Sequence, residues 1–438
     1  MSKVLVIGAA RSGIAVSRLL KEKGYEVLLT DMKTVEQKAE LEQLGIKVYD
    51  EGHPDFLKNT DYEFVVKNPG IPYRVEFIQY FLKNNVPIYT EIEIAYRFSP
   101  NFKYGAITGT DGKTTITTLL YEMLKKNQKA LVAGNIGTPL SELVLEYGDQ
   151  EKDVALELSN FQLLGMNTFK PVVSTVSNLA PDHLDYMDSL EEYYSSKMKI
   201  YENCDANDYF IRNVDDVNVV KYAQNIPCQV IDFSLSRTDV DLYCKDHYAY
   251  YKDTVLFDIR DLKIVGPFNC GNAMMASCMA YLMGVSLKDI QDVIKNFKGV
   301  EHRIEYVATI DDVRYYNDTK ATNTHAACAA LSAFEGNLIL LCGGKDKHIS
   351  FDDMKAYDSK VKHCFSFGQT KDKFKDIFTN QTSCQTMEEA FKEAVTIAKP
   401  GDVVLLSPAC SSFDQFKNYE VRGEIYKQYV LDYAKKRS

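Results

Sequence analysis

Residues 104–126 read YGAITGTDGKTTITTLLYEMLKK. The apolar opening predicts a buried strand over Tyr104–Thr108, and the spacing of apolar residues beyond the loop predicts a helix through Lys126. Between them lies the loop Gly109-Thr110-Asp111-Gly112-Lys113-Thr114-Thr115. In such a loop backbone N–H groups cradle phosphates, the lysine reaches the β- and γ-oxygens, and a hydroxyl binds Mg²⁺. Ile107 replaces the first glycine of the strict G-x-x-x-x-G-K-[ST] pattern. The stretch still predicts an α/β unit that binds a mononucleotide, rather than a chance glycine turn.

Strands followed by glycine-rich or polar turns also occur on both sides of this loop. Upstream, Lys3–Ile7 leads into Gly8–Gly13, and Glu26–Thr30 ends at Asp31. Downstream, three such strands occur at Val313–Tyr316, Leu338–Cys342 and Val403–Leu406. Strands that alternate with helical segments indicate parallel α/β sheets, whose ligands bind beyond the carboxyl ends of the strands.

The pattern therefore predicts an α/β protein of three domains. We expect a Rossmann-like domain over residues 1–97, a central P-loop mononucleotide-binding α/β domain over 98–299, and a Rossmann-like domain over 300–438.

Composition limits the function. A net charge of −10 argues against a nucleic-acid partner, which requires a basic surface. No apolar run approaches the roughly 20 residues of a membrane span, and no export signal is present, so we expect a cytoplasmic protein with free thiols.

The first glycine turn has two of the three glycines of a dinucleotide fingerprint. Gly8 and Gly13 fit, and Asp31 follows at about the right distance, but Ala10 stands where the backbone would approach a pyrophosphate. The turn is compatible with NAD, with a plain strand-to-helix connection, or with a nucleotide diphosphate bound in another geometry. Arg11 and Ser12 offer donors beside a helix N-terminus, which favours the last reading.

Candidate metal ligands follow two later strands. Glu157 ends the apolar run Val154–Leu156, and a carboxylate there suits Mg²⁺ beside a phosphate loop, although a solvated glutamate is the alternative. His183 lies in the loop after Val172–Val176, where a lone histidine is more often simply exposed. Asn272, near the start of a long apolar helix, suits either a helix cap or a contact with a nucleotide base.

Lys197 lies within an apolar stripe of a predicted helix that starts at Ser189 and carries Glu192 three residues later as a capping box. Lys199 falls on nearly the opposite face, because two residues turn the helix by about 200°. A buried ammonium is costly unless it is paired. Lys197 is therefore either a lysine reaching out from the edge of the stripe or a lysine modified to a metal-binding carbamate.

Together these motifs resemble the Mur ligases. The resemblance spans the whole chain in order and rests on the phosphate loop, Gly134–Gly137, Glu157–Gln162, His183, Lys197, Phe268–Asn272, His302-Arg303, Asn317–Asn323, Gly343–Lys347 and Ser407–Tyr419. The last two segments are similar to members that add D-glutamate to UDP-N-acetylmuramoyl-L-alanine. Two residues depart from the expected pattern, since Tyr419 replaces a phenylalanine and Asp111 a common asparagine.

The resemblance implies an ATP-dependent amide-bond ligase of peptidoglycan synthesis that acts, as a monomer, on small molecules. It implies an acyl-phosphate intermediate, Lys113 at the transferred phosphoryl group, and His302 as a possible base for the amine. Mg²⁺ would occupy two sites, formed by Thr114 with Glu157 and by His183 with carbamylated Lys197. ATP would also contact Asn272, Arg303 and Asp318. The UDP-substrate would contact Arg11, Ser12, Asp31, Gly70 and Asn135, and D-glutamate would contact Thr322, Lys347, Ser412 and Tyr419.

Three rival functions remain at this stage. A relative could add another amino acid or act on a folate, a nucleotide-gated binding protein would need only the phosphate loop, and an oxidoreductase would need only the first domain. Lys197 and His183 beside the phosphate loop favour activation of a carboxylate over the last two.

Overall fold

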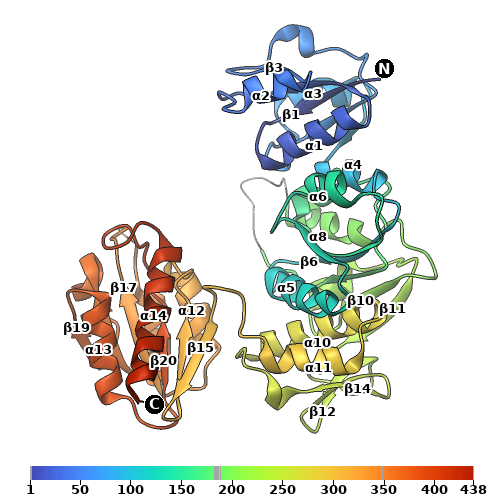
Figure 1. Ribbon diagram of the computed structural model, residues 1–438. Coiled ribbons are helices and arrows are strands. Elements are labelled where there is room, and N and C mark those ends of the chain that lie inside the picture. Colours follow the sequence, from blue (N-terminus) through green and yellow to red (C-terminus); the bar gives the residue numbers. More distant parts are fainter. Residues whose placement is uncertain (1, 182–186, 188, 348, 438) are drawn as a thin grey trace. The chain divides into compact units, whose positions relative to one another are not determined.

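The computed structural model describes residues 2–181, 187, 189–347 and 349–437, and it combines helices with largely parallel sheets, as predicted (Figure 1). The chain forms two compact units. One contains Met1–Asp258 and Gly271–Val293, and the other contains Ile259–Cys270 and Ile294–Ser438. Two sheets belong to the first unit and a third sheet belongs to the second.

The first sheet has five parallel strands in the order 3-2-1-4-5, so the chain reverses direction across the sheet beside β1. In spatial order the strands are β3 (Lys47–Tyr49), β2 (Glu26–Thr30), β1 (Lys3–Ile7), β4 (Phe64–Lys67) and β5 (Ile88–Tyr89). The bounds of β1 and β2 match the predicted ones. Ligands of open parallel sheets bind where the strand order reverses, which here is at the ends of β1 and β4.

The second sheet has nine strands. Its pairings are parallel from β7 through β12, and only the pairings of β12 with β13 and of β13 with β14, at one edge, are antiparallel. In spatial order they are β14 (Thr254–Asp258), β13 (Tyr248–Tyr251), β12 (Leu242–Lys245), β11 (Gln229–Phe233), β10 (Tyr209–Asn213), β9 (Val173–Val176), β6 (Phe102–Thr108), β8 (Lys152–Glu157) and β7 (Ala130–Gly134). The strand that leads into the phosphate loop is therefore central, with β8 and β9 on either side of it.

The third sheet has six strands, and only the pairing of β15 with β16 is antiparallel. In spatial order they are β15 (Glu305–Ile310), β16 (Val313–Asn317), β20 (Val403–Leu406), β17 (Leu338–Gly343), β18 (Val361–Phe367) and β19 (Gln381–Ser383). The three strands predicted in this region, β16, β17 and β20, lie side by side. Their carboxyl-end loops consequently meet at one edge of the sheet.

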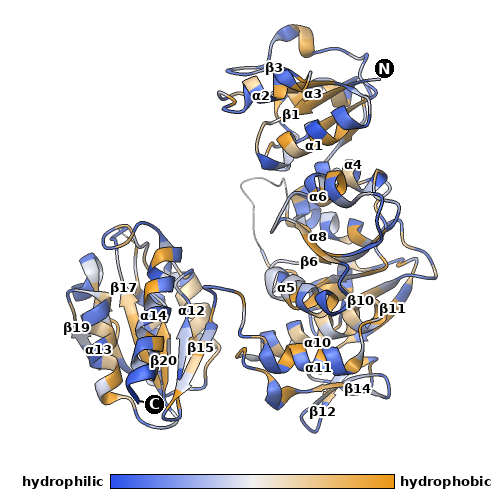
Figure 2. Ribbon diagram, viewed as in Figure 1, coloured by the Kyte–Doolittle hydropathy of each residue, from blue (hydrophilic) through white to orange (hydrophobic). Residues whose placement is uncertain are grey.

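Helices connect the parallel strands, and Figure 2 shows sheets dominated by apolar residues with helices of mixed character. The helices of the first unit are α1 (Arg11–Glu22), α2 (Lys38–Gln43), α3 (Glu76–Lys83), α4 (Glu91–Arg97), α5 (Lys113–Leu124), α6 (Leu140–Tyr147), α7 (Asn160–Leu163), α8 (Leu190–Met198) and α9 (Val217–Tyr222). The remaining ones are α10 (Pro267–Leu282), α11 (Leu287–Asn296), α12 (Thr324–Ser332), α13 (Met387–Ile397) and α14 (Tyr419–Arg437). None of the helices in the described part of the chain is long and apolar enough to cross a membrane.

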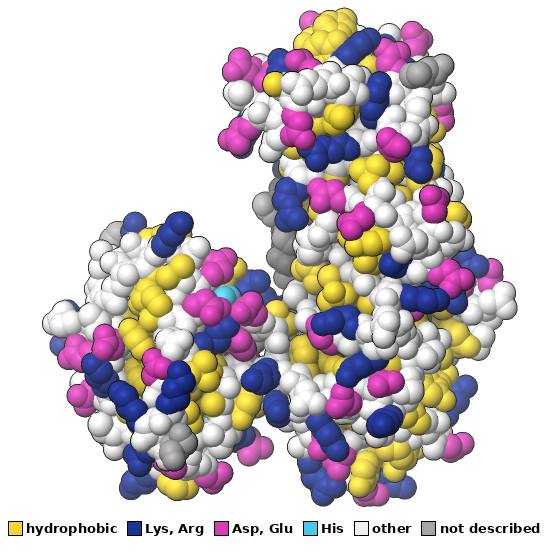
Figure 3. Space-filling model, viewed as in Figure 1, with side chains coloured by type: hydrophobic (Ala, Val, Ile, Leu, Met, Phe, Trp, Pro, Cys, Tyr) yellow, Lys and Arg dark blue, Asp and Glu magenta, His cyan; other side chains and the backbone are white. Residues whose placement is uncertain are grey.

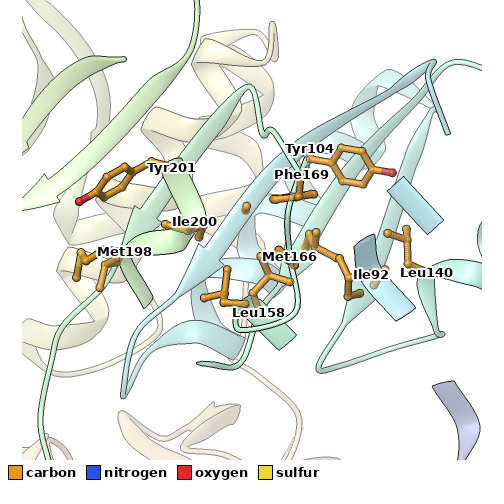
Figure 4. Packing of buried hydrophobic residues seen from close by; sticks show 14 of the residues in the cluster. Ile92, Tyr104, Leu140, Leu158, Met166, Phe169, Met198, Ile200 and Tyr201 are labelled. Atoms are coloured by element: carbon orange, nitrogen blue, oxygen red, sulfur yellow. The ribbon is translucent and has the colours of Figure 1, made fainter. Parts of the chain in front are cut away.

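A large apolar core lies around the central strands of the second sheet (Figure 4). Phe169 packs edge-on against Tyr104 of β6, with ring centroids 5.5 Å apart, and Ile200 and Tyr201 extend the cluster beyond α8. Burial of such side chains contributes roughly 1.5–3 kcal/mol each. The core thereby fixes the helix that carries Lys197 relative to the strand that carries the phosphate loop.

Two buried glutamates of α4, the helix that follows β5 of the first sheet, bond to segments that surround the second sheet. Glu93 accepts hydrogen bonds from the backbone N–H groups of Asn167, Thr168 and Phe169. Burial alone would raise the pKa of Glu93, but these bonds outweigh it and hold the pKa below its usual value. Glu91 accepts the N–H of Ser141 in the first turn of α6, and burial raises its pKa to about 7.

Glu91 predicts a measurable pH dependence of stability. Its folded pKa lies above the unfolded value of 4.5, so its protonated form stabilises the protein below pH 4.5 and this contribution is lost as the pH rises through about 7. The difference corresponds to about 3 kcal/mol. Glu91→Gln keeps an acceptor for Ser141 without the charge, so its stability relative to the wild type should increase between pH 5 and pH 8. Thermal midpoints at both pH values test this, and a difference independent of pH would contradict it.

Candidate active site

The phosphate loop follows β6 and packs against the residues that follow β9. Gly109 has φ +144°, and a Cβ there would lie 2.0 Å from the hydroxyl oxygen of Ser177. Gly112, the N-cap of α5, has φ +81°. Both positions therefore require glycine, the first because of a close approach and the second because of the left-handed conformation. Thr114 and Thr115 lie in the first turn of α5, half-buried and buried.

Two lysines donate to the same carbonyl of this loop. Lys113 Nζ donates to the carbonyl oxygens of Gly109 at 2.8 Å and Thr110 at 2.7 Å, and Lys197 Nζ donates to that of Gly109 at 2.9 Å. Lys197 is only 1% exposed and lies 4.6 Å from the ring centre of Tyr193. Lys199 instead forms a surface ion pair. The predicted contrast between the faces of Lys197 and Lys199 is confirmed, and the carbamate on Lys197 stays a prediction.

Glu157 lies at the end of β8, beside β6, as its place in the sequence predicts. Its side chain is 1% exposed, its Oε1 accepts the amide of Asn135 at 2.9 Å, and its Oε2 is buried with no hydrogen-bond partner among the described residues. A buried carboxylate oxygen without a partner is costly. Carboxylate oxygen is also what Mg²⁺ prefers, so this oxygen fits a metal ligand next to the phosphate loop. The predicted second ligand set includes His183, which lies outside the described residues.

The loop after β7 connects this site with the first sheet. Asn135 is held by Glu157, and Arg11 at the start of α1 donates to the carbonyl of Gly137 at 3.1 Å. The predicted UDP-substrate residues Arg11 and Asn135 thus come from different sheets but converge on one loop. Their contact with a ligand stays a prediction.

The other predicted UDP-substrate residues lie together at the carboxyl ends of β1, β2 and β4. Asp31 accepts the N–H of Ala9 at 2.6 Å, which fixes the first glycine turn. Asn68 donates its side-chain amide to Ser12 Oγ at 3.3 Å and accepts the N–H of Gly70 at 3.1 Å. This is the switch point of the sheet, where a ligand is expected.

Asn272 is buried on α10 and lies against the phosphate loop. A Cβ at Gly112 would come 2.5 Å from its Oδ1. The position is compatible with the predicted contact to a nucleotide. Asn269, earlier in the same helix, instead donates to the carbonyl of Val265 at 2.8 Å, which ties the first turn of α10 to the segment before it.

The third sheet carries a cavity of about 340 Å³ at the carboxyl ends of its strands. All four residues predicted to bind the amino acid line it, and three further lining residues were not predicted. The lining comprises Thr322, Lys345, Lys347, Ser411, Ser412, Phe413 and Tyr419. Two lysines and four hydroxyl groups, without a carboxylate among the lining residues, suit an anionic ligand. The sequence does contain a signal for Lys345, because this lysine lies between the glycine pair and the predicted Lys347.

Arg422 of α14 organises the loops around this cavity. It is completely buried and donates to the hydroxyl and carbonyl of Thr319, both at 2.9 Å, and to the carbonyl of Cys410 at 3.1 Å. Burial lowers its pKa to about 10. Arg422 therefore ties the loop after β16 to the loop after β20, a role that the sequence does not reveal.

Three predicted residues lie near the start of the third sheet. Asp318 accepts the N–H of Ile304 and the hydroxyl of Ser407, and burial raises its pKa to about 7 despite these bonds. Arg303 is exposed. His302 is buried, with Nδ1 3.1 Å from the amide of Asn317, so a role as base stays a prediction.

Comparisons with known proteins decide the family. The model of the Mur ligase middle domain matches residues 107–280, and that of the Mur ligase glutamate ligase domain matches residues 302–410. The chain belongs to the Mur ligase family. This Mur ligase is 41% identical over 436 residues to a UDP-N-acetylmuramoylalanine–D-glutamate ligase of Geobacillus sp. (strain WCH70), covering 97% of this chain and 96% of the relative. It is 39% identical over 434 residues to the protein of that name from Bacillus subtilis (strain 168), covering 96% of each.

Solved structures show the same fold for this Mur ligase at lower identity. The UDP-N-acetylmuramate-alanine ligase of Thermotoga maritima aligns with a TM-score of 0.55 at 19% identity, covering 99% of this chain and all of that one. A pseudomurein peptide ligase type C from Methanothermus fervidus aligns with a TM-score of 0.54 at 18% identity, covering 98% and 100%. The α/β fold predicted from the sequence is thus confirmed. Mur ligases depend on ATP and Mg²⁺, as expected for the phosphate loop.

Glu157 predicts the metal dependence of this Mur ligase. Glu157→Gln removes the charge at the unpaired oxygen but keeps an acceptor for Asn135. The Mg²⁺ concentration needed for half-maximal ADP release should therefore rise about tenfold or more. Glu151→Gln is the matched control, because Glu151 forms an exposed ion pair with Lys129. Equal Mg²⁺ requirements for the two variants would rule out Glu157 as a ligand.

Proposed function

We propose that this Mur ligase joins D-glutamate to the carboxylate of UDP-N-acetylmuramoyl-L-alanine, using ATP. The cavity of the third sheet carries the choice of amino acid. Glutamate presents one amine that reacts and two carboxylates that must be held, and two lysines and four hydroxyl groups line this cavity. The name shared by relatives at 39–41% identity over nearly the whole chain supports the same substrate pair.

We assign one substrate to each of three domains. Residues 1–97 bind the UDP moiety at the ends of β1, β2 and β4, residues 98–299 bind ATP at the phosphate loop, and residues 300–438 bind D-glutamate. The enzyme acts on small molecules in the cytoplasm as a monomer. The contact of Asp31 with the N–H of Ala9 and the absence of a middle glycine favour a uridine diphosphate over NAD in the first domain.

The reaction starts with activation of the carboxylate. One of its oxygens attacks the γ-phosphorus of ATP, ADP leaves, and an acyl phosphate forms, because hydroxide is too poor a leaving group for direct amide formation in water. Lys113 moves from the loop carbonyls to the transferred phosphoryl group, where its charge is needed. Mg²⁺ bound by Thr114 and Glu157, and by His183 with a carbamate on Lys197, would neutralise the charge that develops on the phosphate oxygens.

Amide formation completes the reaction. The amine of D-glutamate attacks the acyl carbon, the tetrahedral intermediate collapses, and inorganic phosphate leaves while the nitrogen loses a proton. Lys347, which donates to the carbonyl of Thr322 at 3.0 Å, and Ser412 hold a carboxylate of the incoming amino acid. Tyr419 and Phe413 cover its methylene groups. Water must be excluded at this stage, since it would hydrolyse the acyl phosphate.

Replacement of Lys347 tests the assignment of the cavity. Lys347→Ala removes a charged donor to a carboxylate, a contact typically worth about 1.5–3 kcal/mol. The KM for D-glutamate should rise roughly 10- to 100-fold, with a smaller effect on kcat and none on the KM for ATP. Lys355→Ala, which removes an exposed lysine paired with Asp352, should change none of these constants. A Lys347→Ala enzyme with the normal KM for D-glutamate would refute the assignment.

Replacement of Lys197 tests the carbamate. A carbamate turns this buried cation into an anion that binds Mg²⁺, so Lys197→Ala should be almost inactive. Added short carboxylic acids such as formate or acetate should partly restore it by replacing the missing carboxylate. Lys199→Ala should behave like the wild type, because Lys199 is paired with Glu202 at the surface. An uncarbamylated ammonium at Lys197 in a metal-loaded crystal would contradict the proposal.

A further inference from the structure

Lys67 is a buried cation that the reaction described above does not use. It is the last residue of β4, its side chain is 0% exposed, and no carboxylate of the described residues lies within 4.0 Å of its nitrogen. Its Nζ donates to the carbonyl oxygens of Asn68 at 3.2 Å, Pro69 at 3.5 Å and Ile71 at 2.7 Å, and it lies 4.5 Å from the ring centre of Tyr73. Burial lowers the pKa of this lysine to about 8.

Burial of an ammonium group without a neighbouring carboxylate costs free energy unless hydrogen bonds to other groups offset that cost. Here Lys67 organises the turn Asn68-Pro69-Gly70-Ile71, which the sequence leaves short of donors. The carbonyls of Asn68 and Ile71 both precede prolines, so neither peptide group has an N–H. The turn itself contributes one backbone bond, from the N–H of Ile71 to the carbonyl of Asn68 at 3.0 Å. Lys67 adds hydrogen bonds to the carbonyl oxygens of Asn68, Pro69 and Ile71.

The turn held by Lys67 faces the first glycine turn of the chain. Asn68 bonds to Ser12 and to the N–H of Gly70, and a Cβ at Gly8 would lie 2.6 Å from Cβ of Asn68. A small displacement of the turn would therefore disturb the ends of both β1 and β4, where the strand order reverses.

We propose that Lys67 is a positioning residue for the nucleotide-diphosphate pocket, holding the 68–71 turn so that Asn68 and Gly70 meet the UDP moiety of the substrate. The inference rests on the proposed function, because it assumes that the first sheet binds that moiety. Lys67 itself touches the turn and the ring of Tyr73, and it acts on the ligand only through the turn.

The test compares Lys67→Met with Lys83→Met in the full-length enzyme. Methionine keeps much of the length and apolar character of the lysine stem but has no donor, whereas Lys83 is exposed on α3. Initial rates of ADP release would give the KM for each of the three substrates, and calorimetry would give the affinity for UDP alone. Lys67→Met should raise the KM for the UDP-substrate and the Kd for UDP at least tenfold. The KM values for ATP and D-glutamate should stay within twofold, and Lys67→Arg should restore part of the UDP affinity.

Two results would overturn the inference. In one, Lys67→Met binds UDP and its substrate like Lys83→Met. In the other, the KM values for all three substrates rise together with a fall in thermal stability, which would indicate a purely structural role. Measurements well below the thermal midpoint of Lys67→Met, or with Lys67→Gln in its place, separate unfolding from loss of affinity. Failure of the wild-type enzyme to turn over the UDP-substrate would instead contradict the proposed function.

Discussion

The close approach of Gly109 to Ser177 is the constraint on which the catalytic centre depends. The absence of a Cβ lets the loop after β6 rest on the segment after β9, and this exposes the carbonyl of Gly109 to two lysines. One of them, Lys113, opens α5 directly after the glycine-rich loop and is the residue we propose for the transferred phosphoryl group. The other, Lys197, is fixed by the apolar core beneath α8. Glu157 completes the centre from the neighbouring strand, because parallel strands end at one edge of the sheet.

Much of this arrangement could be predicted because it follows from local rules. The alternation of apolar strands with helices gave β1, β2 and β20 their bounds to the residue, and the helical period placed Lys197 inside and Lys199 outside. The side-by-side strands β16, β17 and β20 explain why Thr322, Lys347 and Ser412 share one cavity. Acidic and basic side chains are interspersed on the face shown in Figure 3. The candidate site residues therefore stand out from the other charged residues by their burial and their hydrogen-bond partners, not by a local excess of one charge.

The rest depends on tertiary contacts that no local pattern encodes. The antiparallel strands β12, β13 and β14 extend the second sheet through a segment rich in tyrosine and charge, which has no clear alternation. Arg422 and Lys67 are buried cations. Their side chains donate hydrogen bonds to carbonyl groups of turns that are distant in sequence or irregular. From sequence alone such residues look like ordinary surface cations. Their hydrogen bonds reveal instead that Arg422 holds a loop beside the cavity of the third sheet and that Lys67 holds the 68–71 turn.

We propose that a phosphate loop and a cationic cavity on one chain together serve the ligation of D-glutamate. The most direct measurement is ADP release by the purified full-length protein with ATP, Mg²⁺ and UDP-N-acetylmuramoyl-L-alanine, supplied in turn with D-glutamate, L-glutamate, L-alanine, L-lysine and diaminopimelate. We predict ADP release that depends on all three substrates and is fastest, by at least tenfold, with D-glutamate. Faster release with any of the other amino acids would contradict the assignment of the cavity, and release that does not depend on an amino acid would contradict the ligase reaction itself.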